Sequence, residues 1–300
     1  MKRTYDMEFI PAKRIISGYA KGNAWFGNNY NMNIYKGCCH GCIYCDSRSE
    51  CYGVYNFDEV KAKEGVLALI GRELKSKRRT GIVGTGAMSD PYNPYEKEYR
   101  LTRGALELIN ANRFGVSIAT KSDLIVRDID VLKSIKNHSP VLVKITITTA
   151  DDILSKKIEA NVVVSSKRFY AIKELSDNDI FAGILLMPVL PFLEDNEENI
   201  SSIVRLAYVN GAKFIYPAFG VTLRQNQRDW YYKKLDQHFP GLKEKYIKKF
   251  GNAYECRSPK AKALWQLFQK ECDRFGILYK MEDIINGYKQ GYSDNQLSLF

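Results

Sequence analysis

The sequence predicts an α/β fold built around a parallel β-sheet. Six short apolar runs typical of strands are separated by stretches whose apolar residues recur at helical spacing. Neighbouring parallel strands need such helical crossovers between them. The length of 300 residues suits about two average domains, or one barrel-type domain with appendages. Periodicity alone leaves open whether the sheet is open or curls into a partial barrel.

The alternation of strands and helices extends from residue 33 to about residue 220. We expect strands at Asn33–Lys36, Gly81–Gly84, Gly115–Thr120, Val141–Thr148, Ile180–Met187 and Lys213–Tyr216. Apolar residues at helical spacing fill the intervals, around Leu67–Leu74, Leu106–Arg113, Val131–Ile135, Phe169–Leu175 and Ile200–Ala207. The chain thus divides into a lead-in (1–32), an α/β body (33–220), a helical, basic and aromatic C-terminal region (221–290) and a polar tail (291–300).

The composition is that of a globular protein, with 45% hydrophobic and 26% charged residues, which excludes disordered and low-complexity classes. The longest apolar run, Ile180–Leu193, is broken by Pro188 and Pro191 and is too short to cross a bilayer. Polar residues interrupt the segment after Lys2 and Arg3, so no export signal is evident. We therefore expect a cytoplasmic protein without a membrane partner.

Four of the seven cysteines fall within eight residues, and Cys38, Cys42 and Cys45 have the spacing C-x3-C-x2-C. In a reducing compartment such a cluster indicates metal binding or catalysis. Three thiolates can hold three irons of a 4Fe-4S cluster and leave the fourth iron open. A zinc site completed by Cys39 or His40 is the alternative. The remaining cysteines are expected to be packing residues.

This spacing, with an aromatic residue before the last cysteine, resembles the signature of the radical S-adenosylmethionine (SAM) enzymes. Such a site must also hold the amino group, carboxylate, ribose and adenine of SAM. Gly84 and Gly86 would permit close approach of a ligand to the backbone, although an ordinary loop explains them as well. Ser89 and Asp90 offer oxygen acceptors for an ammonium. Lys121, at the carboxyl edge of the predicted sheet, can pair with a carboxylate.

Further motifs resemble the spore photoproduct lyase-related branch of that superfamily. They lie at Gly37–Cys45, Ser89–Glu96, Leu101–Arg103, Thr120–Asp128, Met187–Pro191 and Leu223–Tyr246. The resemblance implies a partial (β/α)6 barrel. It also implies roles in binding SAM: Tyr44 would pack on the adenine, Ser89 and Asp90 would hold the amino end, and Lys121 with Thr146 would hold the carboxylate. Glu159, Arg168 and Pro188 would contribute to the ribose or adenine pocket.

Two departures separate the chain from the lyases themselves. Those enzymes carry a cysteine beside the Ser-Asp pair as a hydrogen donor, whereas Gly86, Ala87 and Met88 stand here. Asn161 occupies a position where a proline is common. The sequence therefore argues against a spore photoproduct lyase proper, and it assigns no catalytic side chain for returning hydrogen.

The resemblance implies that a reduced 4Fe-4S cluster cleaves SAM to methionine and a 5′-deoxyadenosyl radical, which abstracts hydrogen from a substrate. The electron would come from an outside donor, a flavodoxin or a ferredoxin. We expect DNA as the substrate, in a lyase-like repair or base-modification reaction. The alternatives are a radical SAM enzyme acting on RNA, protein or a small molecule, and a non-catalytic metal-binding adaptor for DNA and the sliding clamp.

Charge distribution and the tail favour DNA. The formal net charge is +11, and residues 223–262 hold eleven Lys and Arg against four Asp and Glu, with aromatic residues interleaved. Cations neutralise phosphates and aromatics stack on bases, although a solvated helical face would look the same. The final residues resemble the bacterial sliding-clamp-binding peptide; they are Gln296, Leu297, Ser298, Leu299 and Phe300. Apolar residues on a polar tether suit insertion into a partner's groove.

Overall fold

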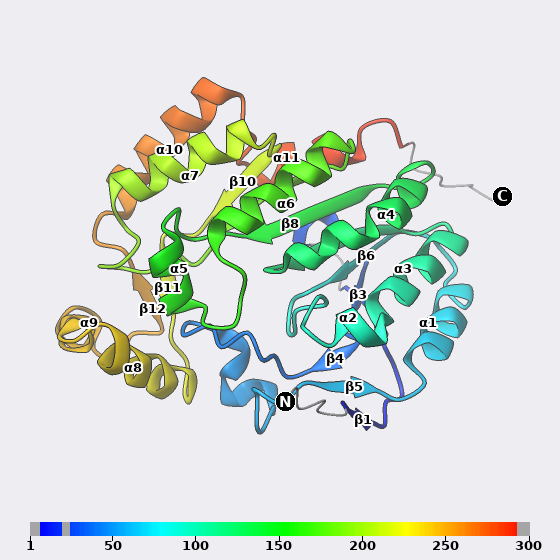
Figure 1. Ribbon diagram of the computed structural model, residues 1–300, viewed down its shortest axis with the longest axis horizontal. Helices are drawn as coiled ribbons and strands as arrows, with labels where there is room; N and C mark the ends of the chain where they lie inside the picture. Colours follow the sequence, from blue (N-terminus) through cyan, green and yellow to red (C-terminus); the bar gives the residue numbers. More distant parts are fainter. Residues whose placement is uncertain (1–6, 20–24, 293–300) are drawn as a thin grey trace.

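The computed structural model describes residues 7–19 and 25–292, so the tail peptide at 296–300 lies outside the described residues. A seven-stranded sheet forms its centre, in the order β10-β9-β8-β7-β6-β3-β2 (Figure 1). Its strands are β2 (Ile16–Gly18), β3 (Tyr30–Met32), β6 (Ile82–Thr85), β7 (Gly115–Thr120), β8 (Val141–Thr146), β9 (Ala182–Leu186) and β10 (Phe214–Pro217). All neighbours are parallel except β2 and β3. Within the described part of the chain, the edge strands β2 and β10 do not pair, so the six parallel strands form a partial (β/α)6 barrel.

The prediction of the first strand was wrong. The first parallel strand is β3, where Tyr30 pairs with Val83 and Met32 with Thr85 of β6, so the barrel begins before residue 33. The predicted run contains β4 (Tyr35–Lys36), which belongs to a separate three-stranded sheet with β5 (Lys61–Lys63) and β1 (Glu8–Ile10). Met32, Ile34 and Tyr35 are all buried, and this run of buried apolar residues does not show where the backbone leaves one sheet for another.

Amphipathic helices cover the outer face of the barrel. These are α1 (Val66–Lys75), α3 (Leu101–Ala111), α4 (Ile129–Lys136), α6 (Ser165–Asp177) and α7 (Glu197–Val209). In α3 the buried positions are 102, 105, 106 and 109, which form one stripe at a spacing of three to four residues. They pack with the outward residues of the strands, including Val141, Val143 and Ile145 of β8, in one core. The helices confirm the predicted crossovers.

The inner face of the sheet carries the alternate residues of each strand. Leu142 of β8 and Phe214 of β10 pack there against Phe26, in a core shared with the last helix, α11 (Met281–Lys289). Between Leu142 and Thr146 lies Lys144, whose ammonium hydrogen-bonds the Ser117 hydroxyl. The lumen of the barrel is therefore apolar at one end and acquires polar groups further along the strands.

After β10 the chain forms a mostly helical region. It comprises β11 (Gly220–Thr222), α8 (Gln227–His238), α9 (Leu242–Phe250), β12 (Glu255–Arg257), α10 (Ala261–Phe275) and α11. Helix α10 packs on α7, whereas α8 and α9 pack on each other and α8 on the turn η2 (Asp46–Arg48) that follows the cysteines. The remaining short elements are α2 (Glu96–Tyr99), α5 (Asp152–Ile158), η1 (Trp25–Gly27), η3 (Glu50–Tyr52) and η4 (Asp123–Asp128).

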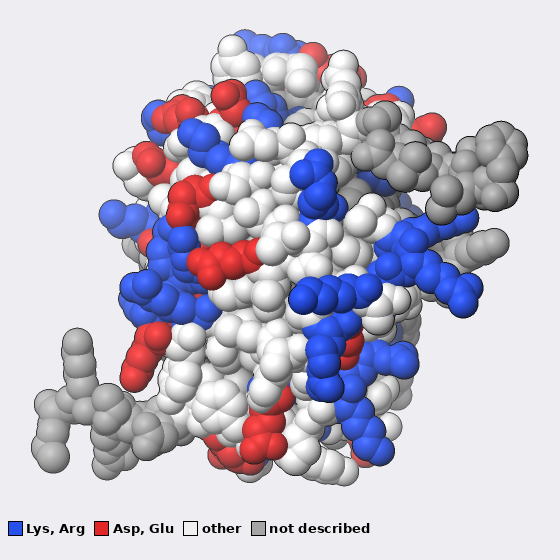
Figure 2. All heavy atoms as spheres, turned by 90° about the vertical axis from the view of Figure 1, so that its right-hand side faces the viewer, with Lys and Arg blue, Asp and Glu red and all other residues white. Residues whose placement is uncertain are grey.

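Positive charge gathers where helices end on the side of the molecule away from α5 and α8. Figure 2 shows this side, on which Lys and Arg outnumber Asp and Glu. Helix α1 has Arg72 and Lys75 in its last turn, and α4 has Lys133 and Lys136. Cations there interact favourably with the negative end of each helix dipole. No helix among the described residues has the length and apolar character needed to span a bilayer.

Candidate functional site

The three cysteines predicted to bind metal lie on one loop between β4 and η2. Gly37 opens the loop with a φ of 79°, and a side chain there would meet the Glu59 carbonyl oxygen at 2.2 Å, so only glycine fits. The next residue, Cys38, donates its backbone N–H to the Phe57 carbonyl at 2.7 Å. The loop is therefore held rigidly at the point where the cysteines begin.

The middle of the loop is bonded to the segment that follows α5. Ile43 donates its N–H to the Ile158 carbonyl at 2.9 Å, and Asn161 donates its own N–H to the His40 carbonyl at 3.0 Å. The Asn161 side chain also donates to the Cys39 carbonyl at 2.7 Å. Proline has no N–H, so the departure from the family pattern at this position supplies two bonds to the cysteine loop.

Lys121 directly follows β7, and its ammonium lies close enough to Cys42 and Cys45 for their charges to act on it. Burial lowers the pKa of Lys121, but the charges of Cys42, Glu159, Asp90 and Cys45 outweigh burial and raise it. Burial raises the pKa of both the Cys42 and Cys45 thiols, and the Lys121 ammonium opposes it in each case. No carboxylate of the described residues lies within ion-pair distance of this ammonium. It is thus available to an anionic ligand beside the thiols.

The donor set suits a cluster better than a single ion. Among the described residues, no three side chains of His, Cys, Asp or Glu converge closely enough to hold one metal ion. A cubane is bound differently, because each thiolate ligates its own iron and the thiols surround a larger group. The charge of Cys45 raises the pKa of Cys42, and that of Cys38 raises the pKa of Cys45, so the three thiols lie near one another. Three thiols on one loop are the kind of donor set that a 4Fe-4S cluster takes.

Asp90 links the loop after β6 to the end of β7. Its carboxylate accepts hydrogen bonds from the Thr120 hydroxyl at 2.6 Å, the Lys121 N–H at 2.7 Å and the Tyr92 N–H at 2.8 Å. His40 Nδ1 lies 3.5 Å from the same group. The neighbouring Ser89 hydroxyl donates to the Gly37 carbonyl. Since a carboxylate offers about four acceptor positions and the three hydrogen bonds to Asp90 use three of them, Asp90 fixes the backbone of Lys121 and keeps one position for a ligand.

Tyr44, Glu159, Arg168 and Thr146 come together from four separate segments. The Tyr44 hydroxyl donates to Glu159, whose other oxygen lies 2.6 Å from Arg168 Nη2. Arg168 also donates to the Thr146 carbonyl at 2.6 Å. Glu159 and Arg168 are 1% and 0% exposed, so each side chain neutralises the charge of the other. Through Glu159, this ion pair holds the Tyr44 hydroxyl in place. The Lys121 ammonium lies 5.6 Å from the centre of the Tyr44 ring.

The predicted glycines and proline also lie at the carboxyl edge of the sheet. A side chain on Gly84 would meet Asn28 at 2.3 Å, and one on Gly86, with a φ of 93°, would meet the Ala119 carbonyl at 1.9 Å. Both glycines therefore allow neighbouring segments to pack closely. The Met187–Pro188 peptide bond at the end of β9 is cis.

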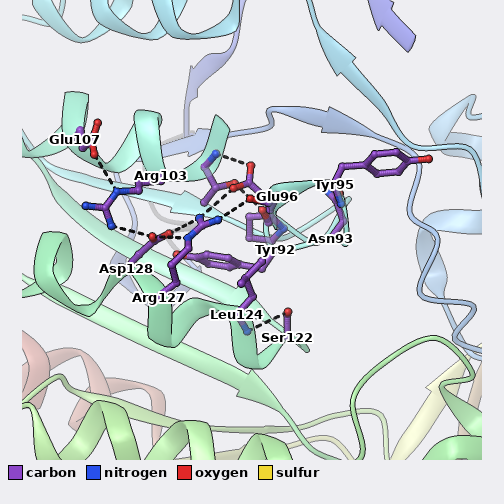
Figure 3. A network of polar contacts seen from close by, with 12 residues as sticks. Tyr92, Asn93, Tyr95, Glu96, Arg103, Glu107, Ser122, Leu124, Arg127 and Asp128 are labelled. Atoms are coloured by element: carbon purple, nitrogen blue, oxygen red, sulfur yellow. Dashed lines mark hydrogen bonds and ion pairs between the residues drawn. The ribbon is translucent and has the colours of Figure 1, made fainter. Parts of the chain in front are cut away.

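A second network of charged residues joins α2 and α3, which follow β6, to η4, which follows β7 (Figure 3). Glu96 accepts from the Thr102 N–H at 2.6 Å and pairs with Arg127 at 3.2 Å. Arg127 also pairs with Asp128 at 2.8 Å, and Arg103 reaches Asp128 at 3.2 Å. These segments carry motifs that are visible in the sequence, but no role for these four charged residues could be predicted from it. Their distance from each other in the chain hid the network.

Three more residues at the site had no signal in the sequence. Gln227 and Trp230 of α8 hydrogen-bond the cysteine loop, although more than 180 residues separate them from it. Glu194 is fully buried, and burial raises its pKa to about 8. Its carboxylate accepts the Leu190 N–H at 2.8 Å, so it shapes the loop after β9.

Comparison with known proteins agrees with this geometry. Residues 32–204, more than half of the chain, match the radical SAM superfamily. An uncharacterized protein of Mycobacterium bovis is 29% identical over 224 residues, covering 72% of this chain and 66% of that protein. An uncharacterized protein of Methanocaldococcus jannaschii is 37% identical over 175 residues, covering 57% and 64%. The chain thus spans about two thirds of the length of these relatives.

Solved structures share the fold at low identity. Spore photoproduct lyase complexed with dinucleoside spore photoproduct has a TM-score of 0.62 at 14% identity, covering 89% of this chain and 79% of that one. A variant of the lyase with bound SAM has a TM-score of 0.61 at 14% identity, covering 83% and 74%. The methyltransferase TsrM from Kitasatospora setae has a TM-score of 0.54 at 10% identity, covering 82% and 51%. The chain belongs to the radical SAM superfamily, whose enzymes use a 4Fe-4S cluster and S-adenosylmethionine.

Proposed function

We propose that Cys38, Cys42 and Cys45 hold a 4Fe-4S cluster and that SAM binds between this loop and the carboxyl ends of β6–β8. The observation that carries the proposal is the Lys121 ammonium, which lies near Cys42, Cys45, Asp90 and Glu159 and has no ion-pair partner among the residues that the structure describes. The chemistry that the cluster and SAM would supply there is hydrogen abstraction from the substrate by a 5′-deoxyadenosyl radical.

Different side chains of the protein would bind different parts of SAM. Lys121 and the Thr146 hydroxyl would hold the methionyl carboxylate, and the Ser89–Asp90 pair would receive the amino group. Tyr44 would pack against the adenine. Glu159 and Arg168 are too deeply buried to reach a ribose, so we assign them to positioning Tyr44. Pro188 would line the nucleoside end.

We infer that the substrate is DNA. Helices α8 and α9 expose Lys233, Lys245, Lys248 and Lys249, which can neutralise phosphates, and α8 packs on η2, directly after the cysteine loop. The lyase of similar fold was solved with a dinucleoside photoproduct, which supports a nucleic-acid substrate. Without a cysteine beside Ser89, the reaction would be a base modification or a repair with another hydrogen donor. An acidic flavodoxin or ferredoxin would supply the electron.

Anaerobic reconstitution with iron and sulfide, then dithionite, SAM and deuterated DNA, tests the proposal. We expect 5′-deoxyadenosine that carries deuterium. Unlabelled 5′-deoxyadenosine would exclude DNA and favour RNA, protein or a small molecule. No 5′-deoxyadenosine at all would favour the non-catalytic adaptor. Cys42→Ala should lose the cluster, whereas Cys272→Ala, a buried cysteine in α10, should keep it.

We also propose that the tail recruits the enzyme to the sliding clamp. The support is the match of Gln296, Leu297, Ser298, Leu299 and Phe300 to the clamp-binding peptide. Deleting these five residues should abolish binding to an immobilised bacterial clamp and leave SAM cleavage unchanged. Equal clamp affinity with and without the tail would overturn this part of the proposal.

A further inference from the structure

Part of the cysteine loop packs against the C-terminal region. Cys42, Ile43 and Tyr44 share a hydrophobic core with Ile158, Val162 and Leu190 of the barrel and with residues from β11 to α9, which include Val221, Leu223, Tyr231, Leu235, Leu242 and Tyr246. The residues that match the superfamily end at 204, before any of these elements begins. A segment outside the family match thus forms one wall of the proposed cluster site.

Gln227 joins this wall to the loop through its whole side-chain amide. Its Nε2 donates to the Tyr44 carbonyl at 3.0 Å and to the Thr222 carbonyl at 2.7 Å. Its Oε1 accepts the Arg224 N–H at 2.9 Å. Gln227 is 0% exposed, so a residue without these groups would leave buried polar atoms unpaired.

Trp230 holds the loop one turn further along α8. Its indole N–H donates to the Cys42 carbonyl at 3.3 Å. The Arg48 guanidinium, just beyond the last cysteine, stacks 3.9 Å from the centre of the indole, and it also pairs with Asp58. A planar guanidinium on an aromatic face is a favourable contact in a site shielded from water. The carbonyls of Cys42 and Tyr44 and the side chain of Arg48 are therefore all fixed from one helix.

We propose that α8 is a cover for the cluster loop and that Gln227 and Trp230 are positioning residues. By fixing the backbone at Cys42 and Tyr44, they set the direction of the thiol and of the aromatic ring, and they keep water from that side of the cluster. This inference rests on the proposed function, because it assumes that the loop binds a cluster.

The first test measures iron release from the reconstituted protein to a ferrous chelator under anaerobic conditions. Trp230→Phe keeps the ring but removes the N–H, so we expect iron to leave about fivefold faster, the effect of one net hydrogen bond. Trp265→Phe, on α10 and away from the loop, is the matched control and should behave like the wild type. Equal rates in the two variants would overturn the inference.

A second pair of variants tests Gln227. Gln227→Met preserves the length of the side chain but removes all three hydrogen bonds, so we expect iron loss at least as fast as in Trp230→Phe. The control is Gln237→Met at an exposed position of the same helix. A cooperative thermal transition, at a lower temperature for Gln227→Met because buried polar groups lose their partners, will show that each variant is folded.

Hydrogen exchange separates this inference from the proposed function. In the cluster-free protein, amides of the loop, such as that of Ile43, should exchange about fivefold faster in Trp230→Phe than in Trp265→Phe. If the wild type takes up no cluster but this difference in exchange appears, the proposed function is wrong, whereas the inference that α8 positions the cysteine loop is supported. If the cluster forms and loop exchange is unchanged, α8 does not position the loop.

Discussion

Replacing Arg168 by methionine tests the structure at its most deeply buried ion pair. Arg168 Nη2 lies 2.6 Å from Glu159 Oε2, and the two side chains are almost inaccessible to solvent. Methionine fills much of the volume but carries no charge, so Glu159 would be left buried without its cation. The Thr146 carbonyl and the Ser155 hydroxyl would each lose a donor as well.

Breaking a buried pair by removing one partner costs about 3–5 kcal/mol. We expect the free energy of unfolding at pH 7 to fall by about that amount, a large share of the roughly 5–15 kcal/mol of a typical protein. The matched control is Lys173→Met on the same helix, whose pair with Asp177 is half exposed. Exposed pairs contribute less than about 1 kcal/mol. Urea unfolding of both variants measures the difference.

The pH dependence gives a second readout. Burial raises the pKa of Glu159, but Arg168, Lys121 and the Tyr44 hydrogen bond outweigh burial and lower it. In the wild type the resulting stability is present above the ordinary carboxyl pKa and is lost as pH falls through the lowered value. In Arg168→Met the carboxyl should take up a proton more readily, so the loss should be smaller at pH 5 than at pH 7. A cost at pH 7 equal to that of Lys173→Met would refute the reasoning.

Three other variants have defined outcomes. Burial lowers the pKa of Lys144 to about 7, so the free energy of unfolding should rise with pH from about 7 toward the ordinary lysine pKa. Lys144→Met should remove this pH dependence and stabilise the protein by about 1–3 kcal/mol at pH 7, measured by urea unfolding. Burial raises the pKa of Glu194 to about 8, so stability should fall as pH rises toward 8, and thermal melts of Glu194→Gln should lack that fall. Asn161→Pro removes donors to His40 and Cys39; less iron per chain after reconstitution is expected, and wild-type iron content would contradict the anchoring role.

The sequence predicted the fold because its signals are local. Five of the six parallel strands lie within two residues of their predicted bounds, and the helices between them follow from apolar spacing. The exception, β3, shows the limit of this approach. Asn31 and Met32 show the same alternation of polar and apolar residues as Asn33 and Ile34. Only the pairing of Tyr30 with Val83 reveals which stretch belongs to the barrel.

The candidate site could be predicted only where its residues form short motifs. Cys38, Cys42 and Cys45 are neighbours in sequence, and Lys121 follows a strand, so both could be placed at one edge of the sheet. The contacts of Gln227 and Trp230 with the loop depend on the packing of α8, which no periodicity encodes. Likewise, nothing in the motif around Glu96 shows that its charge is used by Arg127.

The buried charges around the site explain why its scaffold is so polar. A buried ion pair adds little net stability compared with apolar residues of similar size, because desolvation offsets the attraction. The two buried pairs therefore orient neighbouring groups rather than add stability. Glu159 with Arg168 orients Tyr44, and Glu96 with Arg127 holds the segment after Asp90 against the segment that follows β7. The double variant Glu159→Gln with Arg168→Met should accordingly recover most of the unfolding free energy that Arg168→Met loses, because no charge is left unpaired. It should not fully recover the order of the cysteine loop, since the neutral amide oxygen of glutamine is a weaker acceptor for the Tyr44 hydroxyl than the carboxylate is. Faster exchange of the Ile43 amide in a stable double variant would separate these two effects.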